Sequence, residues 1–444
     1  MPLGPRYRRL FAASTISNLG DGVGVIAYPW LASAITRNPL LIALVAVGQR
    51  LPWLVFTLPA GVLTDRHDRR RIMIGATSVR AVITLGVALA VLARQGALPT
   101  PEDVDQVVGT EWVLYVLLLV ATLLLGTCEV LYDNSAQTFM PSIVETSELE
   151  KANGRLFSAE TVANNFAGPP LAGLLLAVGF ALPFVVDAAS FAASAGLIMA
   201  IAATPRPGPG GASRVERRPF KVELAEGFRW LWSHDLLRTL AITLGVLNLL
   251  GNVSGAVVVL YGQEVLGTSV VEFAIYSTAG AVGGVVGGWA AAAVITRIGS
   301  GGSLALTLWG GGILTIGTGL VSSWAIAAVL LFLSVFTIVL WNVITVSLRQ
   351  AIIPDGMLGR VNSVYRFFGW GAIPIGALVG GLLVAGLDGP LSRTAALRAP
   401  WILAGVAQLA VAAVVGGRLT TARIDAARAA GPAAPSGAVD PASR

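Results

Sequence analysis

Charged side chains are scarce in this chain of 444 residues. Only 12% of the residues are Asp, Glu, Lys or Arg, against about 25% in ordinary soluble domains. Hydrophobic residues make up 55% of the sequence, and the mean hydropathy is +0.76. A globular core cannot bury this much apolar surface, whereas a bilayer can cover it. The scarcity of charge therefore argues against a soluble protein and predicts one that lies in a membrane.

Cysteine, histidine and lysine are rarer still. The single Cys128 excludes an intrachain disulfide, and with only two histidines there are too few ligands for a zinc cluster. A Walker A loop needs Gly-Lys-Ser/Thr, but the two lysines, Lys151 and Lys221, follow Glu150 and Phe220. The sequence also has no nucleophile elbow and no metal signature. We therefore expect no metal, no cofactor, no ATP-driven pump and no enzyme.

Long apolar runs take the place of charge. A helix needs about 20 apolar residues to cross the hydrocarbon core. Twelve runs meet this need, which predicts an all-α membrane protein of twelve transmembrane helices in two six-helix bundles. Their approximate bounds are 11–35, 40–63, 72–93, 112–136, 157–178, 181–203, 237–260, 271–294, 303–322, 324–347, 365–386 and 400–417.

The composition between the runs divides the chain. The segment between the sixth and seventh runs is rich in Pro, Gly and Arg, as linkers are, and then places Phe220, Leu224, Phe228 and Leu231 on one helical face. The last residues are rich in Ala, Pro and Gly, which is typical of disorder. We predict an N-terminal six-helix bundle over 1–204, a cytoplasmic linker with an amphipathic surface helix over 205–235, a C-terminal six-helix bundle over 236–420 and a disordered cytoplasmic tail over 421–444.

Arginine indicates the side of the membrane on which each loop lies. With the N-terminus placed inside, the outside loops hold only Arg37, Arg94, Arg393 and Arg398, and most other basic residues lie inside. This bias follows the positive-inside rule and predicts that both termini are cytoplasmic. The same bias accounts for the net charge of +6, so we expect no nucleic-acid partner. Arginine far outnumbers lysine, which favours a high-GC bacterium and hence the bacterial cytoplasmic membrane.

Two sequence patterns point to a duplicated, moving architecture. Gln137 and Pro141 end the fourth run, and Gln350 and Pro354 end the tenth with the same spacing. This match supports two parallel repeats related by an axis along the membrane normal. A charge-dense hairpin over 61–71 joins the second and third runs.

With these features the chain resembles the major facilitator superfamily. The hairpin matches that family's signature between helices two and three, with Gly61, Leu63, Asp65 and Arg66 before a basic cluster, although Asp68 stands where Gly is usual. The fifth run is similar to the family's antiporter motif at 164–173, with Asn164 in place of the leading Gly and Ala172 as one of the pair of small residues. Within the superfamily the chain resembles the enterobactin-exporter-like and drug-efflux subgroup, on the following residues: 18–21, Glu129 with Asp133, 152–155, 168–170, 186–188, Glu226 with Gly227, and 359–362.

Asp21 is the first candidate for function. It lies about ten residues into the first run, so about 15 Å deep at 1.5 Å per residue. The resemblance implies that helices one, four, seven and ten line a central cavity. An ionised carboxylate at that depth costs free energy, so such residues usually face a cavity and serve a function. Because desolvation raises the pKa of a carboxyl group, it can exchange a proton near neutral pH. We expect Asp21 to couple protons or to recognise a cationic substrate; a structural pair with Arg50 is the alternative.

A cytoplasmic gate is the second candidate. Glu129 and Asp133 lie one helical turn apart at the inner end of the fourth run, and with Asp21 they form the predicted proton-coupling set. The resemblance implies that one of them pairs with Arg69, and that Asp65 lies at the positive N-terminus of helix eleven, so that both contacts hold the outward-open state. Static anchoring is the alternative. The predicted gating residues are Gly61, Asp65, Arg66, Arg69, Arg70, Gly168, Pro169 and Gly173.

Uncharged polar residues in other runs complete the predicted substrate cavity. Asn248 and Asn252 are four residues apart in the seventh run, and Trp341 precedes Asn342 in the tenth. Polar groups among aromatics suit a bulky, partly apolar substrate, although hydrogen bonds between helices would use the same residues. The predicted cavity residues are Asn18, Asp21, Arg50, Asn248, Asn252, Trp341 and Asn342.

The remaining polar and small residues within the runs are expected to be structural. Arg80 and Asp187 lie in helices three and six, which the resemblance implies are outside the cavity. The eighth run carries glycines that predict close helix packing: Gly280, Gly283, Gly284, Gly287 and Gly288.

Together these features predict a secondary active transporter. We expect proton-coupled efflux of small amphipathic molecules, drug-like or siderophore-like, by alternating access of a monomer in the lipid bilayer. A lipid or lysolipid flippase is one alternative, and a non-transporting membrane sensor or scaffold of the same fold is the other.

Overall fold

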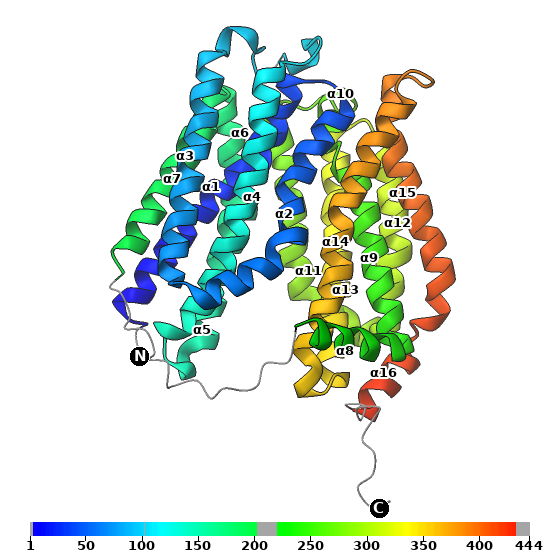
Figure 1. The fold of residues 1–444 in the computed structure, drawn as a ribbon. Coiled ribbons are helices and arrows are strands. Elements are labelled where there is room, and N and C mark those ends of the chain that lie inside the picture. The colour runs from blue at the N-terminus through cyan, green and yellow to red at the C-terminus, as the bar shows by residue number, and fades with distance from the viewer. Residues whose placement is uncertain (1–2, 102, 202–219, 432–444) are drawn as a thin grey trace, which may run out of the picture.

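Helices make up nearly all of the folded chain (Figure 1). A computed structural model describes residues 3–101, 103–201 and 220–431. Within these ranges some residues are described by their backbone alone: Thr57, Leu58, Gly61, Val62, Asp65, Arg66, Asp105, Thr146, Glu150, Phe220, Lys221, Glu223, Leu224, Asp355 and Gly356.

The first half contains the first six predicted membrane helices. Short 3-10 turns, η1 (Gln95–Ala97), η2 (Val104–Gln106), η3 (Met140–Ser142) and η4 (Thr146–Glu148), lie in its loops. The fifth predicted span is interrupted by a π-helical segment, η5. The elements are α1 (Pro5–Ile35), α2 (Pro39–Arg66), α3 (Arg69–Ala93), α4 (Trp112–Phe139), α5 (Leu149–Thr161), η5 (Val162–Ala167), α6 (Gly168–Val178) and α7 (Ala181–Met199).

The second half repeats this arrangement after a short helix, α8, that crosses the end of the bundle (Figure 1). Its elements are α8 (Phe220–Ser233), α9 (Asp235–Gly255), α10 (Val258–Glu264), α11 (Val270–Ala305), the π-helical η6 (Leu306–Gly310), α12 (Gly311–Leu320), α13 (Trp324–Ile352), α14 (Asp355–Leu387), α15 (Arg393–Val415), η7 (Gly416–Arg418) and α16 (Thr421–Ala430).

The helices account for twelve membrane crossings. Eleven helical stretches in the described chain are long and apolar enough to span a bilayer, and one of them, Val270–Leu320, has 51 residues. Gly299 divides that stretch, because its φ of 75° and ψ of 167° are not helical. Only glycine adopts such a φ without strain, and a Cβ at Gly299 would also lie 2.6 Å from the Thr421 hydroxyl. The predicted twelve-helix fold is therefore confirmed, with the eighth and ninth spans meeting at Gly299.

Polar caps set where several of these helices begin. The Asn38 side chain accepts from the backbone of Leu40 and Leu41 at the start of α2. Asp68 caps α3 by accepting from the backbone N–H groups of Arg70 and Arg71. This bond explains why an aspartate is accepted at a hairpin position where glycine is usual.

The two halves pack together mainly toward one end of the molecule. We call the end that carries the N-terminus, α8 and α16 the terminal end, and the opposite end the far end (Figure 1). One buried cluster joins both halves and includes Trp30, Phe184, Tyr261, Phe273 and Trp401. A small cluster of Ala43, Ala256 and Ala377 also joins the halves. The two remaining clusters, which hold the N-terminal residues and the α8 and α16 residues respectively, each stay within one half. The described chain is thus closed at the far end and separated toward the terminal end.

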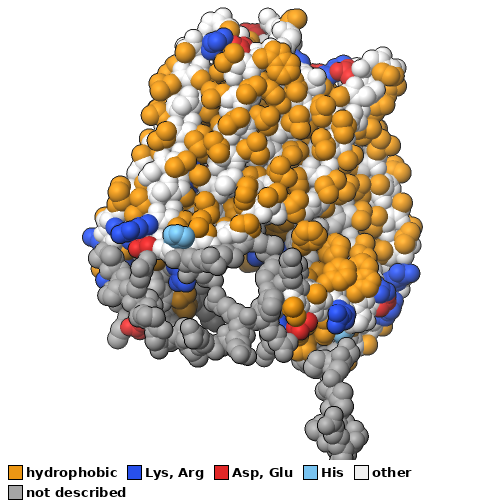
Figure 2. Space-filling model, in the orientation of Figure 1, with side chains coloured by type: hydrophobic (Ala, Val, Ile, Leu, Met, Phe, Trp, Pro, Cys, Tyr) orange, Lys and Arg blue, Asp and Glu red, His pale blue; other side chains and the backbone are white. Residues whose placement is uncertain are grey.

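The outer surface has the character of a membrane protein. Figure 2 shows hydrophobic side chains over the middle of the visible face, with Lys, Arg, Asp and Glu near its two ends. Large apolar side chains such as Trp289, Val82 and Val414 are exposed on the outside of the helices. A bilayer would cover this band.

The tail differs from the sequence prediction, whereas the linker keeps its predicted helix. Residues 421–430, predicted to be disordered, form α16, because Thr420 caps the helix and Ile424 is buried in the cluster of the second half. The predicted helix of the linker is present as α8, with Leu231 buried and Phe228 exposed and stacked on Trp232, and its place on the membrane surface stays a prediction. The linker residues 205–219 and the tail residues 432–444 lie outside the described chain.

Candidate functional site

An ion pair lies between α1 and α3 in the first half. An Arg80 Nη2 donates to the Asp21 carboxylate. The Arg80 side chain is 4% exposed and the Asp21 side chain 31%, so the carboxylate is partly accessible while the guanidinium is buried. The predicted alternative partner, Arg50, is wrong: Arg50 is exposed, and the cation beside Asp21 is Arg80.

A second carboxylate lies behind this pair. Asp187 of α7 is 3% exposed, and its Oδ1 has no hydrogen-bond partner. Gly20 permits this approach, since a Cβ there would lie 2.3 Å from Asp187 Oδ1. The Arg80 guanidinium packs 4.0 Å from the ring centroid of Phe191, one helical turn after Asp187, and its Nε is also without a partner. One guanidinium thus lies among two carboxylates, and Arg80 and Asp187 form part of a charged centre that the sequence assigned to structural contacts.

The predicted acids of α4 lie near the same centre. Glu129 and Asp133 both interact electrostatically with Arg80. Their predicted partner, Arg69, instead donates to the Thr138 carbonyl at 2.8 Å, at the terminal end. Arg70 donates to the carbonyls of Ile198 and Met199, which fixes the end of α7. The contact between Arg69 and an α4 acid was predicted for the outward-open form, in which the terminal end is closed. Because the terminal end is separated here, the predicted gate stays a prediction.

The other predicted gating residues divide into two groups. Of Gly61, Asp65 and Arg66, only the helical backbone of α2 is described. In the fifth span, a Cβ at Gly168 would lie 2.4 Å from the backbone of Gly22, and one at Gly173 would lie 2.9 Å from Ala274 Cβ in the other half. Small residues therefore bring α1 and α6 together and let α6 contact α11, and Pro169 lies in the first turn of α6. Asn164 of η5 donates to Asn18 Oδ1 of α1 at 2.6 Å, which adds a polar contact between α1 and the fifth span.

Charged residues close the far end between the halves. Arg37 donates to Gln263 Oε1 at 2.6 Å and also forms an ion pair with Glu264. Arg393 donates to Glu264 Oε2 at 2.8 Å, to the Arg37 carbonyl at 2.8 Å, and pairs with Asp388. We call Arg37, Gln263, Glu264, Asp388 and Arg393 the far-end cluster. The sequence did not predict this cluster, because its members come from loops and helix ends that lie far apart in the chain.

A cavity of about 430 Å³ lies within the second half. Three of the predicted cavity residues, Asn248, Trp341 and Asn342, line it. Asn252 donates to the Asn248 carbonyl instead, and neither it nor Asn18, Asp21 or Arg50 is among the lining residues. The structure therefore separates the predicted single cavity into a charged centre in the first half and a pocket in the second. The pocket residues that the sequence analysis did not select include Arg349, Tyr365, Arg366, Trp370 and Gln408.

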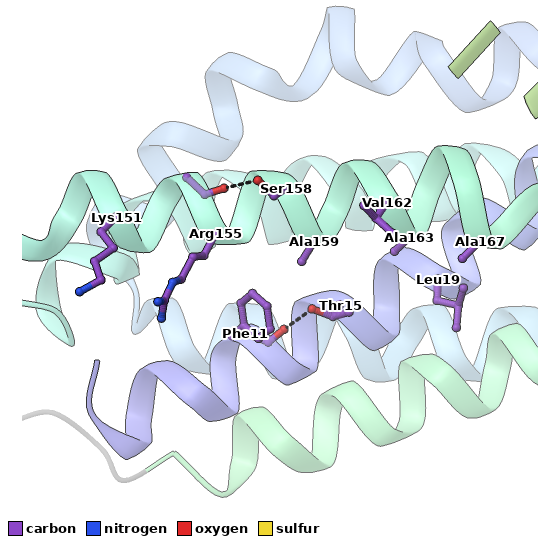
Figure 3. A pocket seen from close by; sticks show the side chains of 11 residues that line it. Phe11, Thr15, Leu19, Lys151, Arg155, Ser158, Ala159, Val162, Ala163 and Ala167 are labelled. Atoms are coloured by element: carbon purple, nitrogen blue, oxygen red, sulfur yellow. Dashed lines mark hydrogen bonds between the residues drawn. The ribbon is translucent and has the colours of Figure 1, made fainter. Parts of the chain in front are cut away.

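An open groove of about 750 Å³ runs between α1 and α5 (Figure 3). Its two hydroxyl groups are already used within their own helices: Thr15 donates to the Phe11 carbonyl and Ser158 donates to the Gly154 carbonyl. The walls of the groove therefore offer few free polar groups. Figure 3 shows Lys151 and Arg155 near one end of the groove, with Leu19 and Ala167 near the other. The cationic end is the terminal end.

The twelve helices and their charged centre define a multi-pass membrane transporter. Residues 10–377 match the family profile described as Major Facilitator Superfamily, so the chain belongs to that superfamily. It is a transporter rather than an enzyme.

Two curated relatives are exporters by name. The multidrug efflux pump Tap of Mycobacterium tuberculosis (strain ATCC 25618 / H37Rv) is 28% identical over 243 residues, which cover 54% of each chain. The match thus spans about half the length of Tap. The enterobactin exporter EntS of Citrobacter koseri is 26% identical over 388 residues, with 85% of each chain covered. A solved structure of a bacterial homologue of the lysosomal transporter Spinster, inward-facing and unoccupied, has the same fold with a TM-score of 0.70 at 14% identity, covering 96% of this chain and 98% of that one.

Proposed function

We propose that this transporter exports small amphipathic molecules in exchange for protons, by alternating access. The observation that carries the proposal is the pair of Asp21 and Arg80 within membrane-spanning helices. A partly exposed carboxylate can take up a proton from inside the bundle. Once neutral it no longer holds Arg80, so the packing of α1 on α3 and α7 depends on the proton. The exporter names of Tap and EntS support the direction of transport.

The proposal assigns the terminal end to the cytoplasm. The form described here, separated toward the terminal end, is then inward-facing, and the far-end cluster closes the outward side. On closure of the terminal end, Asp65, Arg66 and Arg69 of the hairpin approach the second half and the α4 acids, as the gating prediction requires. Protons, the substrate and the lipid bilayer are the partners of a monomer in a bacterial cytoplasmic membrane.

Uptake into inverted membrane vesicles tests this function. With an imposed proton gradient, vesicles that contain the protein should accumulate a lipophilic probe such as ethidium, and an uncoupler should abolish the uptake. Asp21→Asn keeps the shape of the side chain but cannot exchange a proton, so uptake should become independent of the gradient. Arg94→Gln, which removes an ion pair with Glu111 at the far end, is the matched control and should leave uptake unchanged. Undiminished proton-driven uptake by Asp21→Asn rules the coupling role out.

The groove between α1 and α5 favours a second candidate, a lipid or lysolipid flippase. An apolar groove with Lys151 and Arg155 at its end is suited to an acyl chain with an anionic headgroup. In proteoliposomes a flippase should move a fluorescent lysolipid between leaflets faster than it moves ethidium. A sensor or scaffold would move neither.

A further inference from the structure

The pocket of the second half has an unusual set of polar groups. Its lining contains two arginines, Arg349 and Arg366, and no Asp or Glu. The buried acids near Asp21 are all in the first half. The charged side chains of the pocket are therefore basic, whereas acids outnumber Arg80 in the charged centre of the first half. The pocket by itself is suited to an anion.

The arginines of the pocket are held by neutral groups only. Arg349 donates to Asn362 Oδ1 at 2.9 Å and to the Thr345 carbonyl at 3.2 Å, and its guanidinium lies 3.9 Å from the centroid of the Tyr365 ring. Arg366 is exposed on α14, at the side of the pocket. Across the described chain, neither arginine forms an ion pair with a carboxylate. Arg349 is only partly exposed, and a charge kept among low-dielectric helices without a counter-ion is costly, so a ligand that supplies the counter-ion would be stabilised there.

A buried donor in the same wall is also unused. Trp341 is 2% exposed, and its indole Nε1 has no acceptor. An indole nitrogen can only donate, so an acceptor on a ligand would satisfy it. The ring itself gives the pocket an apolar wall, together with Trp370, which contacts Trp53 of the first half at 5.6 Å between ring centroids. The pocket thus lies beside the interface between the halves.

Two amide side chains leave acceptors in the lining. Asn248 Nδ2 donates to the Gly369 carbonyl at 2.8 Å, and Gln408 Nε2 donates to the Thr307 carbonyl at 3.2 Å. Their nitrogens are therefore used by the helices, and their carbonyl oxygens can accept from a hydroxyl of the ligand. A volume of about 430 Å³ is within the range of small-molecule sites.

We propose that this pocket binds the acidic end of the exported substrate, a hydroxylated aromatic acid. Its carboxylate pairs with Arg366 and accepts from Trp341, its ring stacks among the aromatic side chains, and its hydroxyl donates to Asn248 or Gln408. This inference rests on the proposed function, because the pocket is a substrate site only if the protein carries small molecules. It narrows the substrate class from amphipathic molecules in general to those with an anionic aromatic group.

Titration of the purified full-length protein in lipid nanodiscs tests the inference. The probes are 2-hydroxybenzoate and its neutral analogue 2-hydroxybenzamide, with binding read by calorimetry. The acid should bind at least about tenfold more tightly than the amide, because a charge-assisted hydrogen bond exceeds a neutral one by about that factor. Arg366→Gln should remove this preference. Trp341→Phe keeps an aromatic ring but removes the indole N–H, so it should weaken binding of the acid severalfold. Arg418→Gln, outside the pocket, should change neither affinity.

Three results would overturn the inference: no binding of the acid, equal binding of acid and amide, or an unchanged preference in Arg366→Gln. Arg366 has no ion pair to lose, so Arg366→Gln should fold. Elution of this variant as a single monodisperse species in size-exclusion chromatography is the control for folding. The titration requires neither a proton gradient nor transport. A failure here therefore leaves proton coupling standing, and a failure of Asp21→Asn in vesicles leaves the pocket result intact.

Discussion

At the scale of single residues, the central feature is one guanidinium among several acids. Arg80 pairs with Asp21, while Asp187 lies buried behind the pair with an unused oxygen. In a low-dielectric interior two ionised carboxylates beside one cation leave a net charge, which is costly. The net charge of these three groups is zero if Asp187 carries a proton while Arg80 is paired with Asp21.

This charge balance predicts different costs for two neutral substitutions. Arg80→Gln leaves Asp21 without its cation and should lower the free energy of unfolding by about 3 kcal/mol, at the low end for a buried pair because Asp21 is partly exposed. Asp187→Asn replaces a neutral acid by a neutral amide and should cost less than about 1 kcal/mol. Chemical unfolding in detergent measures both. Equal losses in the two variants would show that Asp187 is ionised beside Arg80.

At the scale of helices, small residues decide how closely neighbours approach. In α11, a Cβ at Gly283 would lie 2.2 Å from the Phe332 carbonyl oxygen of α13, whereas one at Gly288 would lie 3.9 Å from Val339. The predicted close packing is tightest at Gly283 and Gly287. A Cβ would lie 3.3 Å from Leu331 at Gly280 and 3.5 Å from Val335 at Gly284, and Gly288 has room for a methyl group.

Gly283→Ala should therefore destabilise the second half, and Gly288→Ala should not. The first forces α11 away from the α13 backbone, which costs about 1–3 kcal/mol for overpacking. The second adds a methyl group in ordinary van der Waals contact and is the matched control. Thermal unfolding in detergent compares them, and the same melting temperature for both would contradict the close contact.

The helices were predictable from the sequence, and most side-chain partners were not. Apolar runs of sufficient length identified all twelve spans, because a bilayer imposes that length locally. The break at Gly299 and the helix over 421–430 depend on a contact between Gly299 and Thr421 and on burial of Ile424, which are tertiary effects. Asp21 was identified from its depth alone. Its partner Arg80 was not, because pairing across helices depends on rotation about each helix axis.

At the scale of the whole molecule, contacts on one side of the interface set which end is open. Glu264 accepts from both Arg37 and Arg393, so it connects the loop after α1 with α10 and the start of α15. The far-end cluster exists only while the far end is closed. The contacts of the far-end cluster therefore stabilise the form that is closed at the far end relative to the form that is open there.

Glu264→Gln should shift the population toward the form that is open at the far end. Loss of the carboxylate leaves two arginines without their shared partner, so the ratio of the two forms should change by about tenfold or more. Distances between spin labels placed in opposite halves at each end, measured in nanodiscs, report the shift. Arg94→Gln lies at the same end but within the first half, and it should leave the distances unchanged. An unaltered distribution in Glu264→Gln would mean that apolar packing alone closes the far end.

Proton counterflow is the most direct test of the central claim that Asp21 exchanges a proton as the halves rock around it. Proteoliposomes with an internal pH dye are given an outward ethidium gradient and no initial pH gradient. The account predicts that ethidium leaving the vesicles draws protons inward, with acidification in the wild type and none in Asp21→Asn. Ethidium movement without acidification in the wild type, or the same acidification in Asp21→Asn, would contradict it.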